Sequence, residues 1–390
     1  MYWVGGNDRR KALFESVYPI PRGVSYNSYL VLDEKTVLLD TVDKEVSDVF
    51  LDGVEHLLSG RQLDYVIVNH MEPDHAATLG ELVVRHPEVR IVCNAKTADM
   101  IKQFFAFDID SRAHLVKEGD TLCTGRHIFT FLMAPLVHWP EVMVTYDMTE
   151  ETLYSADAFG SFGALNGNIF ADESTPDMSE YRRYYTNIVG KYGVQVKALL
   201  NKAQSLRISM ICPLHGLIWR KDIDNLIQKY AKWSAYEPEI KGVLIAYSSV
   251  YGNTQSAAEI VANRLGEQGV KNIQMYDVSV THPSYVVAEA FRYSHIVFAT
   301  TTYNGGIFVT MENLLLDLKA HNLQNRTVAL IENGTWAATA AGQMKNILSS
   351  MKGMNVIANP VTLKSSVKPE KRDELIALAD AICETLKKRY

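Results

Sequence analysis

Short apolar runs separated by turn residues dominate the first part of the chain. From about residue 25 to residue 134, β-branched and aromatic runs such as YVIV, VRIVC and HIFTFLMA alternate with turn residues and a few helical patterns. Runs of this kind predict strands. Helical patterns then cover residues 178–206 and 222–235, with the strand-like ISMIC between them. We therefore expect a sheet-rich α/β domain first.

The pattern changes at residues 233–241, WSAYEPEIK, where a proline and polar residues separate a helix from a new strand. Strand-like runs (GVLIAY, NIQMYDV, HIVFAT, TVALIEN and NVIA) then alternate with helical patterns, among them residues 254–267 and 311–320. Strict alternation of strand and helix predicts a parallel, doubly wound sheet. We expect two domains, at residues 1–240 and 241–390.

Composition removes several classes of function. The chain of 390 residues has a formal net charge of -6, which provides no basic face for nucleic acid. Its charged N-terminus does not resemble a secretory signal, and no apolar stretch is long enough to cross a membrane, so we expect a cytoplasmic protein. The four cysteines lie far apart without a CxxC pair, which excludes a local zinc ribbon or rubredoxin-type site and predicts buried free thiols.

A concentration of metal-ligand side chains follows the strand-like run DYVIVN. The next six residues are HMEPDH, and three further candidates each follow another apolar strand-like run. Each of these residues alone has an ordinary structural interpretation, but hydrophobic packing gives no reason for four such side chains within six residues. Two ions that share a bridging carboxylate would use all the candidates, whereas one octahedral ion would not. The candidate ligands are His70, Glu72, Asp74, His75, His138, Asp157 and His215.

The last third of the chain contains a candidate phosphate loop. GVLIAY ends in the segment SSVYGNT, and a helix begins there. Hydroxyls, backbone amides and a helix N-terminus hold a phosphate without Lys or Arg. The loop lacks the Lys of GxxxxGK[ST], which argues against ATP or GTP. Its candidate contacts are Ser249, Val250, Tyr251, Gly252, Asn253 and Thr254.

Two later loops follow strands of the same predicted sheet, after HIVFA and after TVALIE. In a doubly wound sheet such loops meet at the carboxyl edge, where ligands bind. Their small residues allow close backbone approach, and their aromatic rings, with Tyr251, are available to flank a flavin. FMN is favoured over FAD, because no GxGxxG follows a strand. The candidate contacts are Thr302, Tyr303, Asn304, Gly305, Gly334, Thr335 and Trp336.

HMEPDH, VHWPE, SADAFGSFG and CPLHG resemble the metallo-β-lactamase-like domain of the flavodiiron proteins, and S-x-x-G-N-T resembles the flavodoxin phosphate loop. The resemblance covers nearly the whole chain. It implies a metallo-β-lactamase-like αββα sandwich followed by a flavodoxin-like doubly wound parallel sheet. Zinc hydrolases of this superfamily carry HxHxDH, whereas this chain has Glu72 at the second histidine position. An added carboxylate makes the site harder and more anionic, which suits iron.

The resemblance also implies two iron ions and FMN, with reduction of O2 to water, of NO to nitrous oxide, or of both. One iron would be held by His70, Glu72 and His138, the other by Asp74, His75 and His215, with Asp157 bridging them. No catalytic residue beyond these ligands is expected, although Tyr185 is a weak candidate hydrogen-bond donor. The family implies a head-to-tail homodimer or homotetramer. The chain resembles the two-domain class, so an external donor (rubredoxin, reduced deazaflavin or a reductase) is expected.

Two other functions remain open at this point. One is a zinc-dependent hydrolase of the same superfold with a fused flavodoxin domain, against which Glu72 argues. The other is a flavin electron carrier with a vestigial metal domain, against which the seven ligand-type residues argue. Metal analysis separates the hydrolase from the oxidoreductase, and consumption of O2 or NO separates the oxidoreductase from the carrier.

Overall fold

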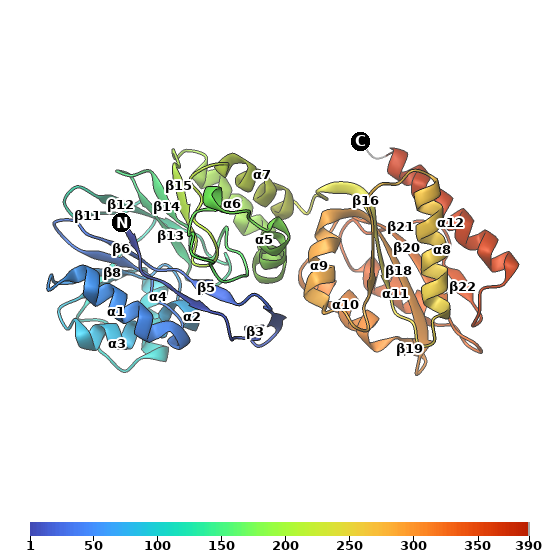
Figure 1. Cartoon of the computed structure of the whole chain (residues 1–390), viewed down its shortest axis with the longest axis horizontal. Helices are drawn as coiled ribbons and strands as arrows, with labels where there is room; N and C mark the ends of the chain where they lie inside the picture. Colours follow the sequence, from blue (N-terminus) through green and yellow to red (C-terminus); the bar gives the residue numbers. More distant parts are fainter. Residues whose placement is uncertain (389–390) are drawn as a thin grey trace. The chain divides into compact units, whose positions relative to one another are not determined.

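The computed structural model describes residues 1–388, which form two compact units, residues 1–231 and the described residues from 232 on. Figure 1 shows the chain coloured along its sequence. Each unit has its own sheet system and its own core, so we describe them separately. Among the described residues, no helix is long and apolar enough to cross a membrane.

The first unit is built on two sheets. One sheet has six strands in the order β1-β6-β7-β8-β9-β10, and the other has five in the order β11-β12-β13-β14-β15. The strands of the first sheet are β1 (Tyr2–Trp3), β6 (Tyr29–Val31), β7 (Val37–Leu39), β8 (Tyr65–Ile67), β9 (Arg90–Cys93) and β10 (Ala113–Leu115). Those of the second are β11 (Thr121–Cys123), β12 (Ile128–Met133), β13 (Met143–Asp147), β14 (Thr152–Tyr154) and β15 (Met210–Cys212).

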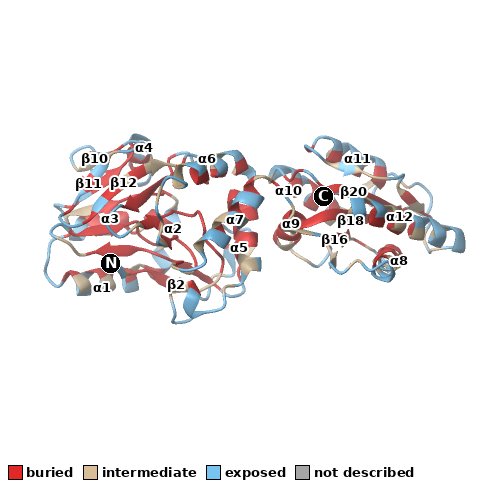
Figure 2. Ribbon diagram, turned by 90° about the horizontal axis from the view of Figure 1, so that it is seen from above, coloured by how far each residue is buried: buried red, intermediate tan, exposed pale blue. Residues whose placement is uncertain are grey.

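The two sheets pack face to face around one apolar cluster. It combines Val31, Leu39 and Ile67 of the first sheet with Phe129 and Phe131 of the second. In Figure 1, α1 (Ser47–Leu58) and α3 (Leu79–Arg85) lie outside the first sheet, whereas α6 (Gly193–Ala203) and α7 (Ile223–Ser234) lie beside the second. The predicted αββα sandwich is confirmed. Burial is concentrated in the strands, and the outer helix faces are exposed (Figure 2).

Shorter elements complete this unit around the sheet edges. Two hairpin-like pairs join β2 (Gly6–Asp8) to β5 (Val24–Tyr26) and β3 (Leu13–Phe14) to β4 (Tyr18–Pro19). The helices α2 (Pro73–Ala76), α4 (Ala95–Phe104) and α5 (Met178–Tyr184) fill the connections. Helical structure over residues 178–206 was predicted, but α5 passes into a π-helical turn, Tyr185–Val189, before α6 begins. Such turns often occur at functional sites.

The second unit is a parallel sheet with helices on both faces. Its strand order is β17-β16-β18-β20-β21, with β22 also paired to β20 and β19 paired antiparallel to β18. The strands are β16 (Ile240–Tyr247), β17 (Ile273–Asp277), β18 (Tyr293–Tyr303), β19 (Gly306–Ile307), β20 (Thr327–Asn333), β21 (Asn355–Val356) and β22 (Val361–Leu363). The predicted doubly wound sheet is confirmed, but the sequence pattern missed β19 and β22.

Two separate apolar clusters fix which helices cover which face of this sheet. Residues of α9 (Pro283–Arg292), α10 (Val309–Ala320) and α11 (Ala340–Ser349) share one cluster. Residues of α8 (Asn253–Glu267) and α12 (Pro369–Lys388) share the other. The carboxyl ends of β16, β18 and β20, which are neighbours in the sheet, carry the candidate flavin loops.

All four cysteines are free. Cys93, Cys212 and Cys383 are buried as predicted, and burial raises the pKa of the Cys93 thiol to about 12. The prediction is wrong for Cys123, which lies exposed at the end of the edge strand β11, where its side chain leaves the core.

Candidate metal centre and flavin-binding edge

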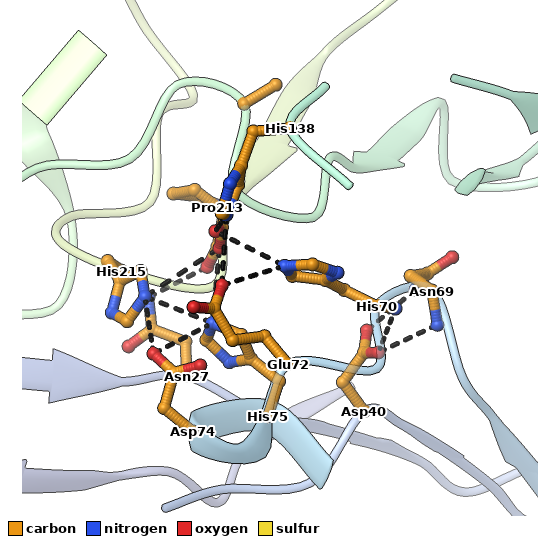
Figure 3. A network of polar contacts seen from close by, with 12 residues as sticks. Asn27, Asp40, Asn69, His70, Glu72, Asp74, His75, His138, Pro213 and His215 are labelled. Carbon is orange, nitrogen blue, oxygen red and sulfur yellow. Dashed lines mark hydrogen bonds and ion pairs between the residues drawn. The ribbon is translucent and has the colours of Figure 1, made fainter. Parts of the chain in front are cut away.

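Loops that leave the two sheets of the first unit bring all seven candidate ligands together. His70 and Glu72 lie between β8 and α2, while Asp74 and His75 lie in α2 itself, which begins at Pro73. His138 lies between β12 and β13, and Asp157 and His215 follow β14 and β15. A proline at the first helical position turns the chain out of the strand, since its φ is already helical and its missing N–H costs nothing there. Figure 3 shows the side chains converging.

The ligand atoms form two groups, and each could hold one ion. The first group is His70, Glu72, His138 and Asp157, and the second is Asp74, His75 and His215. In the first, His138 Nε2 lies 2.9 Å from Glu72 Oε2 and 3.0 Å from Asp157 Oδ2. In the second, the Nε2 atoms of His75 and His215 are 3.0 Å apart. Two ligands at right angles, each about 2.1 Å from one ion, are separated by about 3 Å, so both groups have the spacing of a coordination sphere.

Asp157 connects the two groups through its two carboxylate oxygens. Its Oδ2 lies 3.0 Å from His138 Nε2, in the first group, whereas its Oδ1 lies 3.1 Å from His75 Nε2, in the second. The residue is fully buried. A carboxylate with one oxygen directed at each group has the geometry of a bridging ligand.

The charges in the cluster stabilise one another. Burial opposes ionisation of Asp157, but the imidazole of His75 and its neighbours hold the pKa of that carboxyl well below its usual range. Burial likewise disfavours the charged form of His138, but Asp157 and Glu72 raise its pKa to about 9. Both oxygens of Asp74 and Oδ1 of Asp157 are buried and accept no hydrogen bond from the described chain, although His75 Nε2 lies 3.1 Å from Asp157 Oδ1. Buried carboxylate oxygens are costly unless a donor or a cation satisfies them, so the donor set fits metal ions.

A layer of hydrogen bonds orients the ligands. Glu141 accepts from His70 Nδ1 at 2.8 Å and from the Met71 amide at 2.9 Å. His215 Nδ1 lies 2.7 Å from the carbonyl oxygen of Ser25. Asp40, also buried, accepts from the amides of Asn69 and His70 and fixes the loop that leaves β8. Partners of this kind fix the tautomer and direction of a ligating imidazole.

Glu141 offers a test of that orienting layer. Glu141→Ala is expected to weaken metal binding by about 10- to 100-fold, because His70 loses the carboxylate that fixes its ring. Glu141→Gln should have a smaller effect, since the amide oxygen still accepts these bonds. Dissociation constants for Co²⁺, followed by visible absorption, provide the measurement. Glu118→Ala is the control, because Glu118 also accepts a hydrogen bond from a backbone amide, that of Met133, but contacts no imidazole in the described chain. Equal affinities in Glu141→Ala and the control would contradict the role.

Two side chains beside the cluster were not identified from the sequence. Tyr184 is fully buried, its ring centroid is 5.5 Å from that of His215, and its hydroxyl has no hydrogen-bond partner in the described chain. Burial and the nearby carboxylates, Asp157 first, raise its pKa. Glu15, an exposed residue in the turn between β3 and β4, interacts with the carboxylate of Glu72, and this neighbouring negative charge raises the pKa of Glu15. The weak sequence candidate, Tyr185, instead packs its ring on Tyr230 at 4.9 Å.

The candidate flavin loops occupy one edge of the second unit. After β16, α8 begins at Asn253 behind Gly252, which has a φ of +88° and open space where a Cβ would lie. No side chain caps this helix, so its first amides are available to an anion. Tyr251 and Trp336 are each 91% exposed. Uncapped amides beside large exposed rings fit a phosphate with an attached aromatic ring system.

The structure refines the roles of several candidate flavin contacts. Asn304 and Gly305, with φ of +50° and +74°, form the two-residue turn between β18 and β19, an Asn-Gly hairpin signal that the sequence interpretation did not use. The hydroxyl of Thr302 accepts from the amides of Thr339 and Ala340, at the start of α11. The hydroxyl of Ser249 accepts from the Gly252 amide. These side chains shape the loops through bonds within the protein.

Comparisons with known proteins agree with this architecture. Residues 24–216 match the family model described as ODP family beta lactamase, and residues 245–376 match Flavodoxin. The chain is 30% identical over 365 residues to a nitric oxide reductase of Moorella thermoacetica, covering 92% of this chain and 90% of the relative. It is 29% identical to the anaerobic nitric oxide reductase flavorubredoxin of Aeromonas hydrophila, covering 95% of this chain and 75% of that protein.

A solved structure extends the likeness to the whole fold. The rubredoxin oxygen:oxidoreductase from the anaerobe Desulfovibrio gigas superposes with a TM-score of 0.92 at 28% identity, covering 99% of this chain and 96% of that one.

Proposed function

Because the chain belongs to the flavodiiron protein family, we propose that it reduces dioxygen to water, nitric oxide to nitrous oxide, or both. The seven-residue cluster holds two iron ions in the first unit, and FMN in the second unit supplies electrons. The observation that carries the proposal is Asp157, which directs one carboxylate oxygen at each of two ligand groups. A pair of ions with a shared carboxylate, together with a flavin, can store the electrons that complete reduction of a diatomic oxidant requires.

The donor set favours iron over zinc. Each group combines imidazoles with carboxylates, and no cysteine belongs to either. Glu72 adds a hard, anionic oxygen where zinc hydrolases of the superfold carry histidine, and such ligands stabilise ferric iron. When bound, paired irons supply the binding and reduction of the diatomic substrate. The protein's own residues orient the ligands, exclude water and offer a hydrogen bond at the site.

Tyr184 is the residue best placed to offer that hydrogen bond to substrate. Its hydroxyl is buried next to the cluster and has no partner in the described chain. Tyr184→Phe is expected to lower turnover about 5- to 10-fold with metal content unchanged, since one hydrogen bond contributes about 1 to 1.5 kcal/mol. Tyr181→Phe is the control, because the Tyr181 hydroxyl accepts from the Leu217 amide instead. Turnover in Tyr184→Phe equal to that of the control would refute the assignment.

Electrons reach the flavin from a separate donor in this proposal, such as rubredoxin, reduced deazaflavin or a reductase. The protein acts as a head-to-tail homodimer or homotetramer, in which the flavin unit of one subunit serves the metal unit of another. Support for both statements comes from the family. Analytical ultracentrifugation tests the assembly, and a purely monomeric protein that still turns over would exclude it.

Cofactor stoichiometry tests the proposed sites. Protein purified anaerobically from iron-supplemented cells should contain two iron ions and one FMN per chain, by metal analysis and by release of the flavin. Two zinc ions per chain, together with hydrolysis of a thioester or lactam, would replace the proposal with the hydrolase function.

A further inference from the structure

The loop between β20 and α11, residues 334–339, presents the exposed Trp336 at the flavin-binding edge. Loops that display a large exposed ring are ordinarily mobile, because few contacts hold them. This loop is instead fixed at both ends by side-chain hydrogen bonds.

At its start, the carboxamide of Asn333 pairs with the backbone of Ser365, in the loop after β22. Asn333 Nδ2 donates to the Ser365 carbonyl at 2.9 Å, and the Ser365 amide donates to Asn333 Oδ1 at 2.9 Å. Asn333 is buried. Two antiparallel bonds between planar groups define both the distance and the rotation of the two loops, which one bond alone would not do.

Neighbouring contacts extend this pairing. The Gly334 amide donates to the Leu363 carbonyl, and the hydroxyls of Thr335 and Ser365 lie 2.8 Å apart. A Cβ on Gly334 would lie 2.7 Å from the Cα of Ala338. The loop therefore folds back tightly on itself immediately after Asn333, and a displacement at Asn333 is passed on to Trp336.

At its end, the loop is held where α11 begins. The Thr302 hydroxyl accepts from the amides of Thr339 and Ala340, and the carboxylate of Glu332 accepts from the Ala341 amide and the Thr362 hydroxyl. The start of the loop is therefore fixed to the loop after β22, and its end is fixed to β18.

We propose that the Asn333–Ser365 pair is a positioning clamp, which fixes the position of the loop that carries Trp336. The clamp thereby determines how tightly FMN binds and how much the affinity differs between the redox states of the flavin. The inference rests on the proposed flavin site and names determinants outside the predicted contacts, since neither Asn333 nor Ser365 was among them. A preorganised site distinguishes the redox states of a cofactor through fixed dipoles and fixed exclusion of water. If the loop is less firmly held, the affinities for the different redox states of the flavin become more alike.

The holoprotein provides the test. Asn333→Ala should increase FMN dissociation, measured by recovery of flavin fluorescence after dilution, by about tenfold, as expected for loss of the paired bonds. It should also lower the fraction of one-electron-reduced flavin seen at half-reduction during photoreduction, a readout that general destabilisation does not move. Asn346→Ala, at an exposed position of α11, is the control and should match the unsubstituted protein.

A second pair of variants separates the clamp from the serine side chain. Ser365 has a φ of +67° and pairs with Asn333 through its backbone. Ser365→Gly keeps both of those bonds and loses only the hydroxyl contact with Thr335, so it should increase FMN dissociation much less than Asn333→Ala does. Asn333→Asp loses the Nδ2 donor and should resemble Asn333→Ala. Flavin retention and one-electron yield in Asn333→Ala equal to those of Asn346→Ala would overturn the clamp. Failure of the unsubstituted protein to bind FMN would instead overturn the proposed function.

Discussion

Replacement of Asp157 by Asn is expected to abolish loading of the paired metal site while the flavin stays bound. The carboxylate directs one oxygen at each ligand group, so its loss opens both coordination spheres and removes the anion between two cations. We expect metal affinity to fall more than about 100-fold, since even partners outside the coordination sphere contribute about 10- to 100-fold. Metal analysis and the visible flavin spectrum of the same sample measure the two outcomes together.

Asp147→Asn is the matched control for this experiment. Asp147 is another buried aspartate of the first unit and lies 2.6 Å from an imidazole, Nδ1 of His127, but belongs to neither ligand group. It should keep its metal. Loss of FMN as well as metal in Asp157→Asn would contradict the independence of the two sites, and full metal loading would contradict the bridging role.

Replacement of Thr254 by Val is expected to weaken FMN binding by roughly 10- to 100-fold and to leave metal content unchanged. Thr254 is buried at the second position of α8, behind the open Gly252. A hydroxyl bonded to a charged phosphate contributes about 1.5 to 3 kcal/mol, and valine keeps the shape while removing the bond. Flavin retained after extensive dialysis measures the change.

Thr310→Val makes the same chemical change at the second position of another helix, α10. The Thr310 hydroxyl has no hydrogen-bond partner in the described chain, so we expect flavin retention in this variant to be unchanged. If Thr254→Val retains flavin as well as Thr310→Val does, the phosphate does not bind at the start of α8.

The fold could be predicted because its main signals are local. The alternation of GVLIAY, HIVFAT and TVALIEN with helices specifies a doubly wound sheet, since each apolar run is long enough to be a buried strand. β22 was not predicted, because a strand of three residues is too short to show a periodic pattern of apolar positions. The π-helical turn that begins at Tyr185 was not predicted either, because such a turn has an apolar pattern close to that of an α-helix and changes only which side chains face inward.

The ligand cluster was visible because four candidates lie within six residues, and a strand end before each of the others places it at a sheet edge. The residues that contact the ligands and orient them could not be predicted, because they lie far from the ligands in the sequence. Asp40 and Glu141 act on His70 across distant sequence separations, and Glu15 reaches Glu72 from a hairpin far away in the chain. Tyr184 and Tyr185 are adjacent and chemically identical, so only the direction of each ring in the fold separates them.

Reoxidation of the iron-loaded, chemically reduced protein under anaerobic conditions tests the central claim most directly. Dioxygen and nitric oxide are added separately, and the flavin spectrum and the products are followed by rapid mixing. The account predicts fast reoxidation by at least one gas, with water or nitrous oxide as the product, and loss of that reaction in Asp157→Asn. Flavin that cycles at the same rate in both proteins, without consumption of either gas at the metal site, would contradict it.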